Sequence, residues 1–451
     1  MPGATTLPAS ELSSLFGAYL QAVCRRSAQA LASCGYRALL VHSGSLLPVF
    51  EDDRTYPFEA NAPFKVWTPL AEPDCFVYFQ PDQIPVLVFN QPTNYWHKPP
   101  APPEGYWTAY FDIRTCPDRE SARAVLPPDL GTTAYLGEAF AELGSWGTAA
   151  KNPARLIRHL DFGRAVKSPY ELACLREASR LGARGHLAAQ RAFAAGESEF
   201  GIELAFLAAC GLREQELPYN PIIALNESAS VLHYQVLEKH APAARHSLLI
   251  DAGAEFAGYA SDITRTYSAG DGDFSALIAR MHAMQHALCE GVRPGADWRE
   301  VHLRAHRLTA QVLQEAEILT CSADEALAAG VTSVFLPHGI GHLLGLEVHD
   351  AGGFMRSPEG GDIPRPEGHP YLRLTRTLEE GFVVTMEPGI YFIDSLLQAA
   401  QADKRARLIN WSRVKTLRKF GGIRIEDDLA VTATGCENLT REAFRAELSP
   451  T

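Results

Sequence analysis

The chain has 451 residues, of which 46% are apolar and 21% charged, and its formal net charge is −12. This length exceeds one ordinary hydrophobic core, so two domains are predicted. The composition is typical of a soluble globular protein. The acidic balance argues against nucleic acid or an anionic membrane surface as a partner, because both favour basic patches.

The nine cysteines are scattered and never form a Cys-x-x-Cys pair. Neither a disulfide framework nor a thiolate zinc site is therefore predicted. The first eight residues lack the basic and apolar regions of a signal peptide. No uninterrupted apolar run reaches about 18 residues, so no membrane-spanning helix is predicted. We expect a cytoplasmic protein.

The first part of the chain alternates short β-prone runs with proline-rich connections. Residues 38–42 are predicted to form a strand, and residues 75–79 and 85–89 flank a turn and indicate a hairpin. The segment 94–107 is dense in proline and aromatic residues, which favours a loop.

The next change in the residue pattern is a strong signal for the start of a helix. Ser168 is suited to the N-cap, Pro169 to the first helical position, and Glu171 completes a capping box. We place a domain boundary just before it, which predicts a smaller α/β domain over 1–163 and a second domain over 164–451.

After this boundary, helical and strand-like patterns alternate, which predicts an α/β (α+β) protein. Helices are predicted over 169–194, 198–213, 274–290 and 297–317. Strands are predicted over 247–251, 257–267, 382–386, 389–393 and 423–431.

Two aspartates in these strands need an explanation, because Asp is a poor strand residue and an unpaired buried carboxylate is costly. Runs 247–253 and 259–266 indicate a hairpin, in which Asp262 and Thr264 would share a face and Asp251 could lie alongside. Like charges this close would repel unless a cation lay between them. The alternative, a turn-capping Asp251 and a surface Asp262, remains open on this segment alone.

Three histidines, His338, His342 and His349, occur within twelve positions. The first two have the spacing of a helical zinc site, but glycines lie between them and each costs a helix about 1 kcal/mol relative to alanine. A loop that brings imidazoles to a buried site is favoured instead. A structural role stays open for any one of the three, and His338 is the weakest candidate.

Two glutamates, Glu387 and Glu426, lie within apolar strand-like runs. Pairing with a neighbour such as Arg424 is an alternative to metal binding for each. Taken together, the segments supply four carboxylates and one imidazole, from Asp251, Asp262, His342, Glu387 and Glu426. This oxygen-rich set suits Mn²⁺ first, with Zn²⁺, Co²⁺ or Fe²⁺ as other occupants. Four carboxylates balance two bridged divalent ions better than one.

The motifs IDAGAEFAGYASDITRTY, LPHGIGHLLGLEVHD, VVTMEPGIYF and GIRIEDD occur in this order between residues 250 and 428. In this combination the chain resembles the pita-bread metallopeptidases, which include methionine aminopeptidase, aminopeptidase P and prolidase. Within that family it is most similar to the bacterial prolidases (Xaa-Pro dipeptidases), and the NYWHKPP run of the N-terminal half is similar to that group as well.

The resemblance implies a pita-bread fold for the second domain and metal ligation by all five residues named above. It implies that His233 and Arg373 bind the substrate and that His349 contacts the scissile carbonyl or the tetrahedral intermediate. Arg424 would hold Glu426 in place without binding the metal itself, and Thr264 would hold the ligands in the same way. Glu387 would in addition relay a proton to the departing nitrogen.

The activity implied is hydrolysis of Xaa-Pro dipeptides by a hydroxide that bridges two divalent metal ions. The alternatives are an aminopeptidase P-like or organophosphorus-hydrolysing relative, or a non-catalytic binding module, which would require degraded ligands. A homodimer is expected, with the aromatic loop at residues 95–97 reaching the neighbour's cleft. The Gly- and Pro-rich segment 355–370 does not align well with the family, so the sequence does not predict the structure of the lid over the site.

Overall fold

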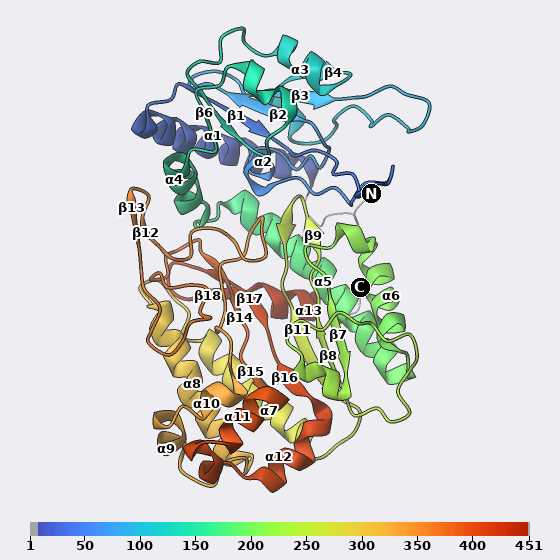
Figure 1. The fold of residues 1–451 in the computed structure, drawn as a ribbon, viewed down its shortest axis with the longest axis vertical. Helices are drawn as coiled ribbons and strands as arrows, with labels where there is room; N and C mark the ends of the chain where they lie inside the picture. Colours follow the sequence, from blue (N-terminus) through green and yellow to red (C-terminus); the bar gives the residue numbers. More distant parts are fainter. Residues whose placement is uncertain (1–7, 450–451) are drawn as a thin grey trace.

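The protein has two domains, which lie one above the other in Figure 1, and the computed structural model describes residues 8–449. The N-terminal domain contains a six-stranded sheet of order β4-β3-β2-β1-β5-β6. Its strands are β1 (Ala38–His42), β2 (Phe76–Phe79), β3 (Val86–Asn90), β4 (Asp112–Cys116), β5 (Thr133–Leu136) and β6 (Ala150–Lys151). Its helices are α1 (Ala9–Cys34), α2 (Ala62–Lys65), α3 (Arg119–Val125) and α4 (Ala154–Arg164).

The predicted strand and hairpin of this domain are confirmed. Strands β2 and β3 pair antiparallel, with Phe76 opposite Val88, and β1 pairs antiparallel with β2 and parallel with β5. Every residue of β1, β2 and β3 is buried, as expected of strands covered on both faces. The segment 94–107 contains no helix or strand.

The long helix α1 was not among the predicted elements. It begins after Pro8 without a side-chain cap and ends at Gly35, whose φ of 81° is left-handed. The sequence therefore offers a C-terminal signal for this helix and only a weak N-terminal one. Its buried residues, which include Phe16 and Leu20, join the core shared with β1 and β2.

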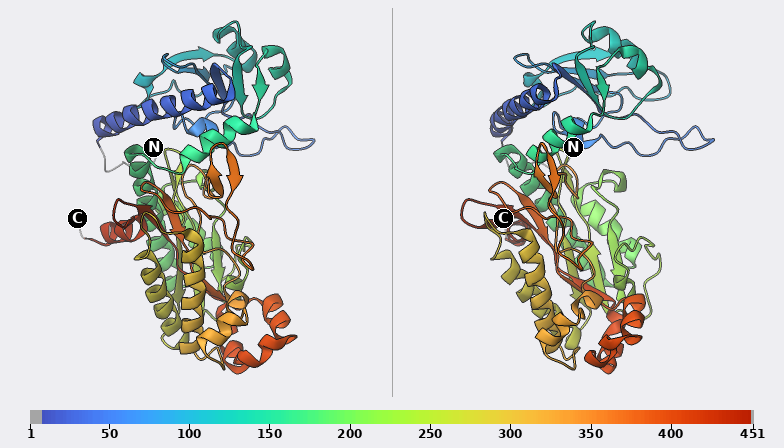
Figure 2. Two further views of the ribbon diagram at one scale, coloured as in Figure 1. Left: turned by 90° about the vertical axis from the view of Figure 1, so that its left-hand side faces the viewer. Right: turned by 60° about the vertical axis from the view of Figure 1, so that its left-hand side comes forward.

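The C-terminal domain consists of short antiparallel strands enclosed by helices (Figures 1 and 2). Its sheets have the orders β11-β8-β7, β14-β17-β18, β15-β16, β10-β9 and β12-β13. The strands are β7 (Ile222–Leu225), β8 (Ser247–Asp251), β9 (Glu255–Phe256), β10 (Tyr259–Ala260), β11 (Thr264–Ser268), β12 (Met355–Ser357), β13 (Gly360–Asp362), β14 (Val383–Met386), β15 (Gly389–Tyr391), β16 (Gly422–Arg424), β17 (Asp427–Val431) and β18 (Cys436–Asn438).

Helices pack on the outside of these strands. Helix α13 contacts α5 and β17, while α7 contacts β11, β14 and β16. Figure 2 shows the yellow helices α7 and α8 along one side of the strands. The helices are α5 (Pro169–Ala195), α6 (Glu199–Cys210), α7 (Asp273–Cys289), α8 (Trp298–Glu315), α9 (Ala323–Ala328), α10 (Thr332–Phe335), α11 (Asp394–Gln401), α12 (Trp411–Leu417) and α13 (Leu439–Leu448).

The four helices predicted for this domain are confirmed to within three residues at each end, and α5 begins with the predicted capping box at Ser168. Two predicted strands are wrong as continuous elements. The strand predicted over 257–267 is divided into β10 and β11, and the strand predicted over 423–431 into β16 and β17. The breaks contain Asp262 and Glu426. The main chain at these two positions bonds outside its own strand ladder: Asp262 N donates to the Asp428 carboxylate, and Glu426 N donates to Thr264 O.

A buried cluster of charges joins the two domains. Asp350, whose side chain is 1% exposed, accepts hydrogen bonds from Arg164 at the end of α4 and from Lys167 Nζ, the latter at 2.8 Å. Burial opposes ionisation of Asp350, but these two cations hold its pKa below the usual value. The cluster therefore fixes the loop that carries the neighbouring His349.

We expect Asp350→Asn to lower the free energy of unfolding by about 3–5 kcal/mol, because it leaves buried Lys167 without its carboxylate and leaves Arg164 with only Asp161 and Glu347. Urea unfolding followed by fluorescence measures this. The control is Asp362→Asn, since Asp362 is 65% exposed in its pair with Arg158 and should contribute under about 1 kcal/mol. Equal losses in both variants would show that the buried cluster does not hold the domains together.

Candidate metal centre

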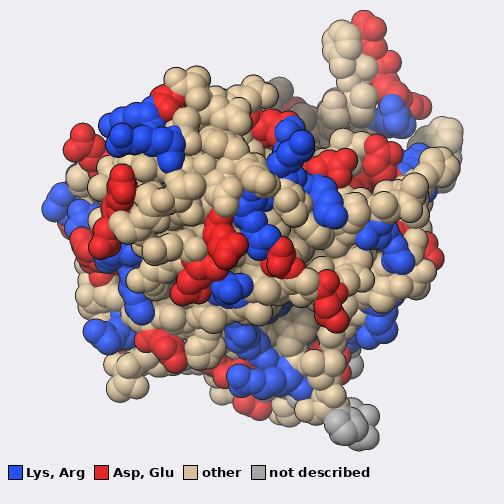
Figure 3. Space-filling view, turned by 90° about the horizontal axis from the view of Figure 1, so that it is seen from below, with Lys and Arg blue, Asp and Glu red and all other residues tan. Residues whose placement is uncertain are grey.

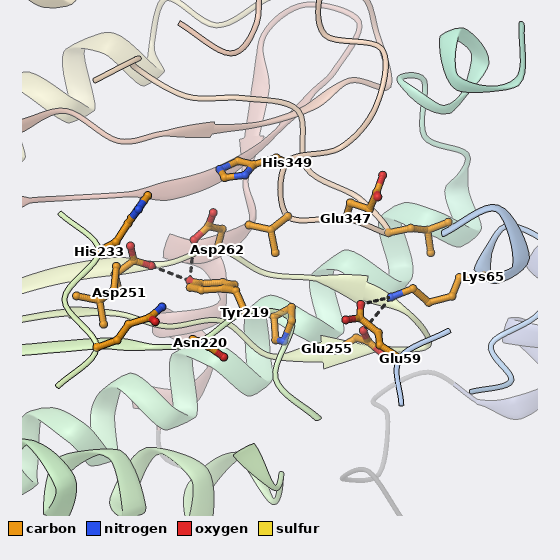
Figure 4. Close-up of a pocket in the computed structure, with 15 residues that line it drawn as sticks. Glu59, Lys65, Tyr219, Asn220, His233, Asp251, Glu255, Asp262, Glu347 and His349 are labelled. Carbon is orange, nitrogen blue, oxygen red and sulfur yellow. Dashed lines mark hydrogen bonds and ion pairs between the residues drawn. The ribbon is translucent and has the colours of Figure 1, made fainter. Parts of the chain in front are cut away.

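Two of the predicted ligands face each other across one tyrosine. Asp251 ends β8, and Asp262 lies in the break before β11. The hydroxyl of Tyr219 is 2.8 Å from Asp251 Oδ1 and 2.7 Å from Asp262 Oδ1 (Figure 4). One hydroxyl proton can be donated to only one carboxylate at a time. The two carboxylates therefore need positive charge from another source.

The imidazole of His342 faces the same carboxylates. Its Nδ1 lies 3.0 Å from the carbonyl oxygen of Leu343, which places the proton on Nδ1 in the neutral ring and directs Nε2 into the site. Nε2 is 3.4 Å from Asp262 Oδ2 and 3.9 Å from Glu387 Oε1. Burial opposes protonation, yet Asp262 and Glu387 raise the pKa of His342.

Glu426 enters from the opposite sheet and is held by Thr264, whose hydroxyl donates to Glu426 Oε2 at 2.6 Å. The guanidinium of Arg424 donates to Thr264 Oγ1 at 3.1 Å and to Asp251 Oδ2 at 2.6 Å. Among these residues, Arg424 therefore pairs directly with Asp251 and reaches Glu426 through Thr264. Thr264 also lies opposite Asp251 in the β8–β11 ladder, as the predicted hairpin requires.

The electrostatics of the site favour cations. Burial raises the pKa of Glu387 to about 7. Burial, with Asp262, Glu387 and Asp251 as neighbours, raises the pKa of Glu426 well above its usual value. Arg424 supplies a single positive charge to four carboxylates. Removing four carboxylates from water requires either protons or metal ions in compensation.

The donor atoms fit divalent metal ions. One ligand atom each from Asp262, His342 and Glu426 lies within 4.8 Å of the other two, and all three residues are buried. The neighbouring Asp251 and Glu387 complete an oxygen-rich set with one imidazole, which suits hard divalent ions. The residues at the site therefore fit the metals that the sequence predicts.

The predicted substrate-binding residues lie around this set. His233, His349 and Arg373 line a cavity of about 630 Å³ together with the five predicted ligands. The ring of His349 stands edge-on to His342, with 4.4 Å between centroids. Burial, together with His342 and Arg373, lowers the pKa of His349 to about 4. This histidine is therefore neutral near pH 7 and keeps one N–H to donate.

A second cavity, of about 650 Å³, leads from Asp251 and Asp262 toward the N-terminal domain. At its far end Lys65 Nζ lies 3.3 Å from Glu59 Oε1 and 3.5 Å from Glu255 Oε2 (Figure 4). Both domains thus supply walls to the space beside the predicted ligands. Lys65, Glu59 and Glu255 were not predicted as site residues.

Two residues outside the predicted ligand and substrate-binding sets contact the predicted ligands. Tyr219 lies in a loop without a recognisable motif, so no signal in the sequence marked it. His338, the weakest of the three histidine candidates, lies 3.5 Å from Glu387 Oε2 through Nδ1 and 2.8 Å from the Tyr391 hydroxyl through Nε2. It lies beside Glu387, and its spacing from His342 had already made it a candidate.

Comparisons with known proteins agree with this geometry. The model of metallopeptidase family M24 matches residues 173–433, more than half of the chain. The chain belongs to this family. A model described as the Xaa-Pro dipeptidase N-terminal domain matches residues 14–162.

Relatives of the same family extend over nearly the whole chain. The Xaa-Pro dipeptidase of Stenotrophomonas maltophilia strain K279a is 48% identical over 434 residues, which cover 96% of this chain and 98% of the relative. The Xaa-Pro dipeptidase of Xanthomonas axonopodis pv. citri is 47% identical over 442 residues, covering 98% and 100%.

Solved structures of family M24 share the fold. Escherichia coli aminopeptidase P with the inhibitor Pro-Leu superposes with a TM-score of 0.71 at 24% identity, covering 94% of this chain and 95% of that one. The zinc-substituted form of the E. coli enzyme, in complex with product, gives a TM-score of 0.70 at 23% identity, covering 96% and 99%. The pita-bread fold and its N-terminal domain are thus confirmed.

We expect Thr264→Val to weaken divalent-metal binding by about 10- to 100-fold, because it removes the hydroxyl that donates a hydrogen bond to Glu426 and accepts one from Arg424. Titration of chelator-treated protein with Mn²⁺ measures the change. The control is Thr264→Ser, which keeps the hydroxyl and should bind like the parent. Equal affinities for the Val and Ser variants would contradict the role of this hydroxyl.

Proposed function

We propose that the chain is a metal-dependent dipeptidase that hydrolyses Xaa-Pro dipeptides. The observation that carries the proposal is one cavity lined by five predicted metal ligands and by His233, His349 and Arg373. Relatives 47–48% identical over nearly the whole chain are named Xaa-Pro dipeptidases, which supports the same substrate class here.

In this proposal Asp251, Asp262, His342, Glu387 and Glu426 hold two divalent ions, with Mn²⁺ favoured by the oxygen-rich set. Zn²⁺, Co²⁺ and Fe²⁺ are the other candidates. When bound, such ions lower the pKa of water, which makes a nucleophile available near neutral pH, and polarise the carbonyl.

The remaining residues bind the substrate and move protons. Arg373 and His233 hold the proline carboxylate, since a guanidinium offers paired donors to that anion. Neutral His349 donates its N–H to the carbonyl oxygen as negative charge develops there. Glu387 passes a proton to the departing nitrogen.

We also propose a homodimer of this chain, with the loop at residues 95–97 in the contact. Tyr95 and Trp96 are 87% and 75% exposed and lie against each other with ring centroids 4.7 Å apart. Exposed aromatic pairs of this kind are enriched in protein interfaces. Light scattering that shows only monomer at working concentration would contradict this assembly.

The surroundings proposed for the enzyme are the cytoplasm, a peptide substrate, and neither nucleic acid nor membrane as a partner. Within residues 8–449, none of the helices has the length and apolarity needed to cross a membrane. The face seen in Figure 3 intersperses acidic and basic side chains. Charges mixed in this way do not favour a polyanion over other partners.

Arg373→Ala tests whether Arg373 limits the substrate to dipeptides by binding their C-terminal carboxylate. Arg373 is exposed in the free chain, so its pair with the substrate carboxylate is buried only by the bound substrate. Loss of one partner of such a pair costs about 2–5 kcal/mol, so we expect kcat/KM for an Xaa-Pro dipeptide to fall about 30- to several-thousand-fold at about 1.4 kcal/mol per decade. The preference for the dipeptide over its C-terminal amide should shrink in parallel. Steady-state kinetics with both substrates measure this.

The control for this experiment is Arg356→Ala, because Arg356 is exposed on β12, in the Gly- and Pro-rich segment 355–370 that precedes Arg373. It should leave both substrates unaffected. If the dipeptide-to-amide ratio stays constant in Arg373→Ala, Arg373 does not recognise the carboxylate.

Metal removal tests the oxygen-rich centre. We expect exhaustive dialysis against chelator to abolish dipeptide hydrolysis and Mn²⁺ to restore it more fully than Zn²⁺, because four carboxylates outnumber one imidazole. Activity and metal content are measured on the same samples. Undiminished turnover in metal-free protein would refute a metal-dependent reaction.

A further inference from the structure

A second group of possible metal ligands lies apart from the five residues described above. His302 and His306 project from α8, and His369 belongs to the segment that follows β13. One ring nitrogen from each lies within 4.8 Å of the other two. His302 Nε2 is 2.9 Å from His369 Nδ1, and the three ring centroids are 4.6–4.8 Å apart.

The local structure explains why these side chains meet. Residues four apart on a helix share a face, and on α8 that face is turned inward, so His302 and His306 are 1% and 2% exposed. His369 is only partly buried and closes the group from the solvent side. A helical pair plus one imidazole from a loop gives three nitrogen donors that converge on one point.

The three imidazoles are neutral and offer lone pairs. Burial, followed by His306 and His369, lowers the pKa of His302 to about 2, and burial followed by His369 lowers that of His306 to about 4. Burial also lowers the pKa of His369. A cation can bind all three rings at neutral pH once the proton between His302 Nε2 and His369 Nδ1 moves to another ring nitrogen.

Hydrogen bonding within the protein leaves part of the group unsatisfied. His306 Nδ1 lies 2.9 Å from Thr332 Oγ1, at the start of α10. His306 Nε2 and His302 Nδ1 are buried and have no hydrogen-bond partner among residues 8–449. Buried polar atoms are nearly always paired, so such atoms call for a ligand. His306, with Thr332 on Nδ1 and with Nε2 unpaired, has the usual arrangement of a metal-binding histidine.

We propose that His302, His306 and His369 bind one Zn²⁺ ion, separate from the carboxylate-rich centre. Neutral imidazoles suit zinc, whereas manganese prefers oxygen. Three histidines leave a fourth tetrahedral position for water, on the solvent side beside His369. Two nitrogens bound to one tetrahedral zinc ion at about 2.0–2.1 Å lie about 3.4 Å apart, so the 2.9 Å between His302 Nε2 and His369 Nδ1 widens slightly on binding.

This ion fastens a wall of the cavity to α8. Pro370, Tyr371 and Arg373, which follow His369, line the 630 Å³ cavity. The ion limits the motion of the segment that positions Arg373, a consequence for substrate binding that rests on the proposed function. Zinc binding itself does not depend on that function.

The experiment uses the full chain with the first centre disabled by Asp262→Asn and Glu426→Gln. After chelator treatment, calorimetric titration should show one Zn²⁺ per chain in this background. Adding His306→Ala should weaken that binding by more than about 100-fold, since even residues behind a ligand contribute 10- to 100-fold. Zinc-edge absorption should show three imidazoles, and hydrogen exchange over 363–373 should slow when zinc is added.

His369→Ala, at a half-exposed loop position, is the second variant and removes a ligand without a change in the helix core. His286→Ala is the matched control, because His286 is exposed on α7 and 60% accessible. Circular dichroism checks folding. The inference is overturned if the background protein binds no zinc, or if it binds zinc equally well after His369→Ala. Failure of dipeptide hydrolysis in the parent protein would bear on the proposed function and leave this result unchanged.

Discussion

The mutual repulsion of four buried carboxylates is the constraint on which the C-terminal domain depends. Asp251, Asp262, Glu387 and Glu426 share one site that Arg424 alone cannot neutralise. Burial alone would drive such groups to the neutral form, and the raised pKa of Glu387 and Glu426 shows this tendency. The site is thus a cluster of acidic side chains, and cations that bind to it stabilise the folded protein.

The breaks in the strands allow these carboxylates to converge. A regular strand directs alternate side chains to opposite faces, and its main-chain groups pair within the ladder. Asp262 and Glu426 leave the ladder, and the bridge between Thr264 and Glu426 joins the two sheets at the site. Carboxylates from different sheets therefore converge on one volume, which a single flat strand pair could not achieve.

These interruptions also mark how far the sequence could predict the structure. The capping box at Ser168 and the period of α5 are local signals, and they located that helix within a residue of its observed end. The grouping of Asp251, Asp262 and His342 could be inferred because each is an unusual residue for its setting. Tyr219 and the α8 histidines satisfy ordinary local rules. Their roles arise from contacts over 32 and 67 residues of chain, which no local pattern encodes.

The two cavities meet at the carboxylates and differ in chemistry on either side of them. The one with Arg373 also contains Arg365, whereas the other ends at Lys65 with Glu59 and Glu255. Under the proposed function, a dipeptide has its carboxylate on the first side and its amino end on the second. Because Lys65 and Glu59 belong to the N-terminal domain, the amino side is complete only while the two domains remain packed against each other. Asp350, which binds Arg164 at the end of α4 and Lys167, lies one residue from His349, so the contact with α4 and the placement of His349 depend on the same loop.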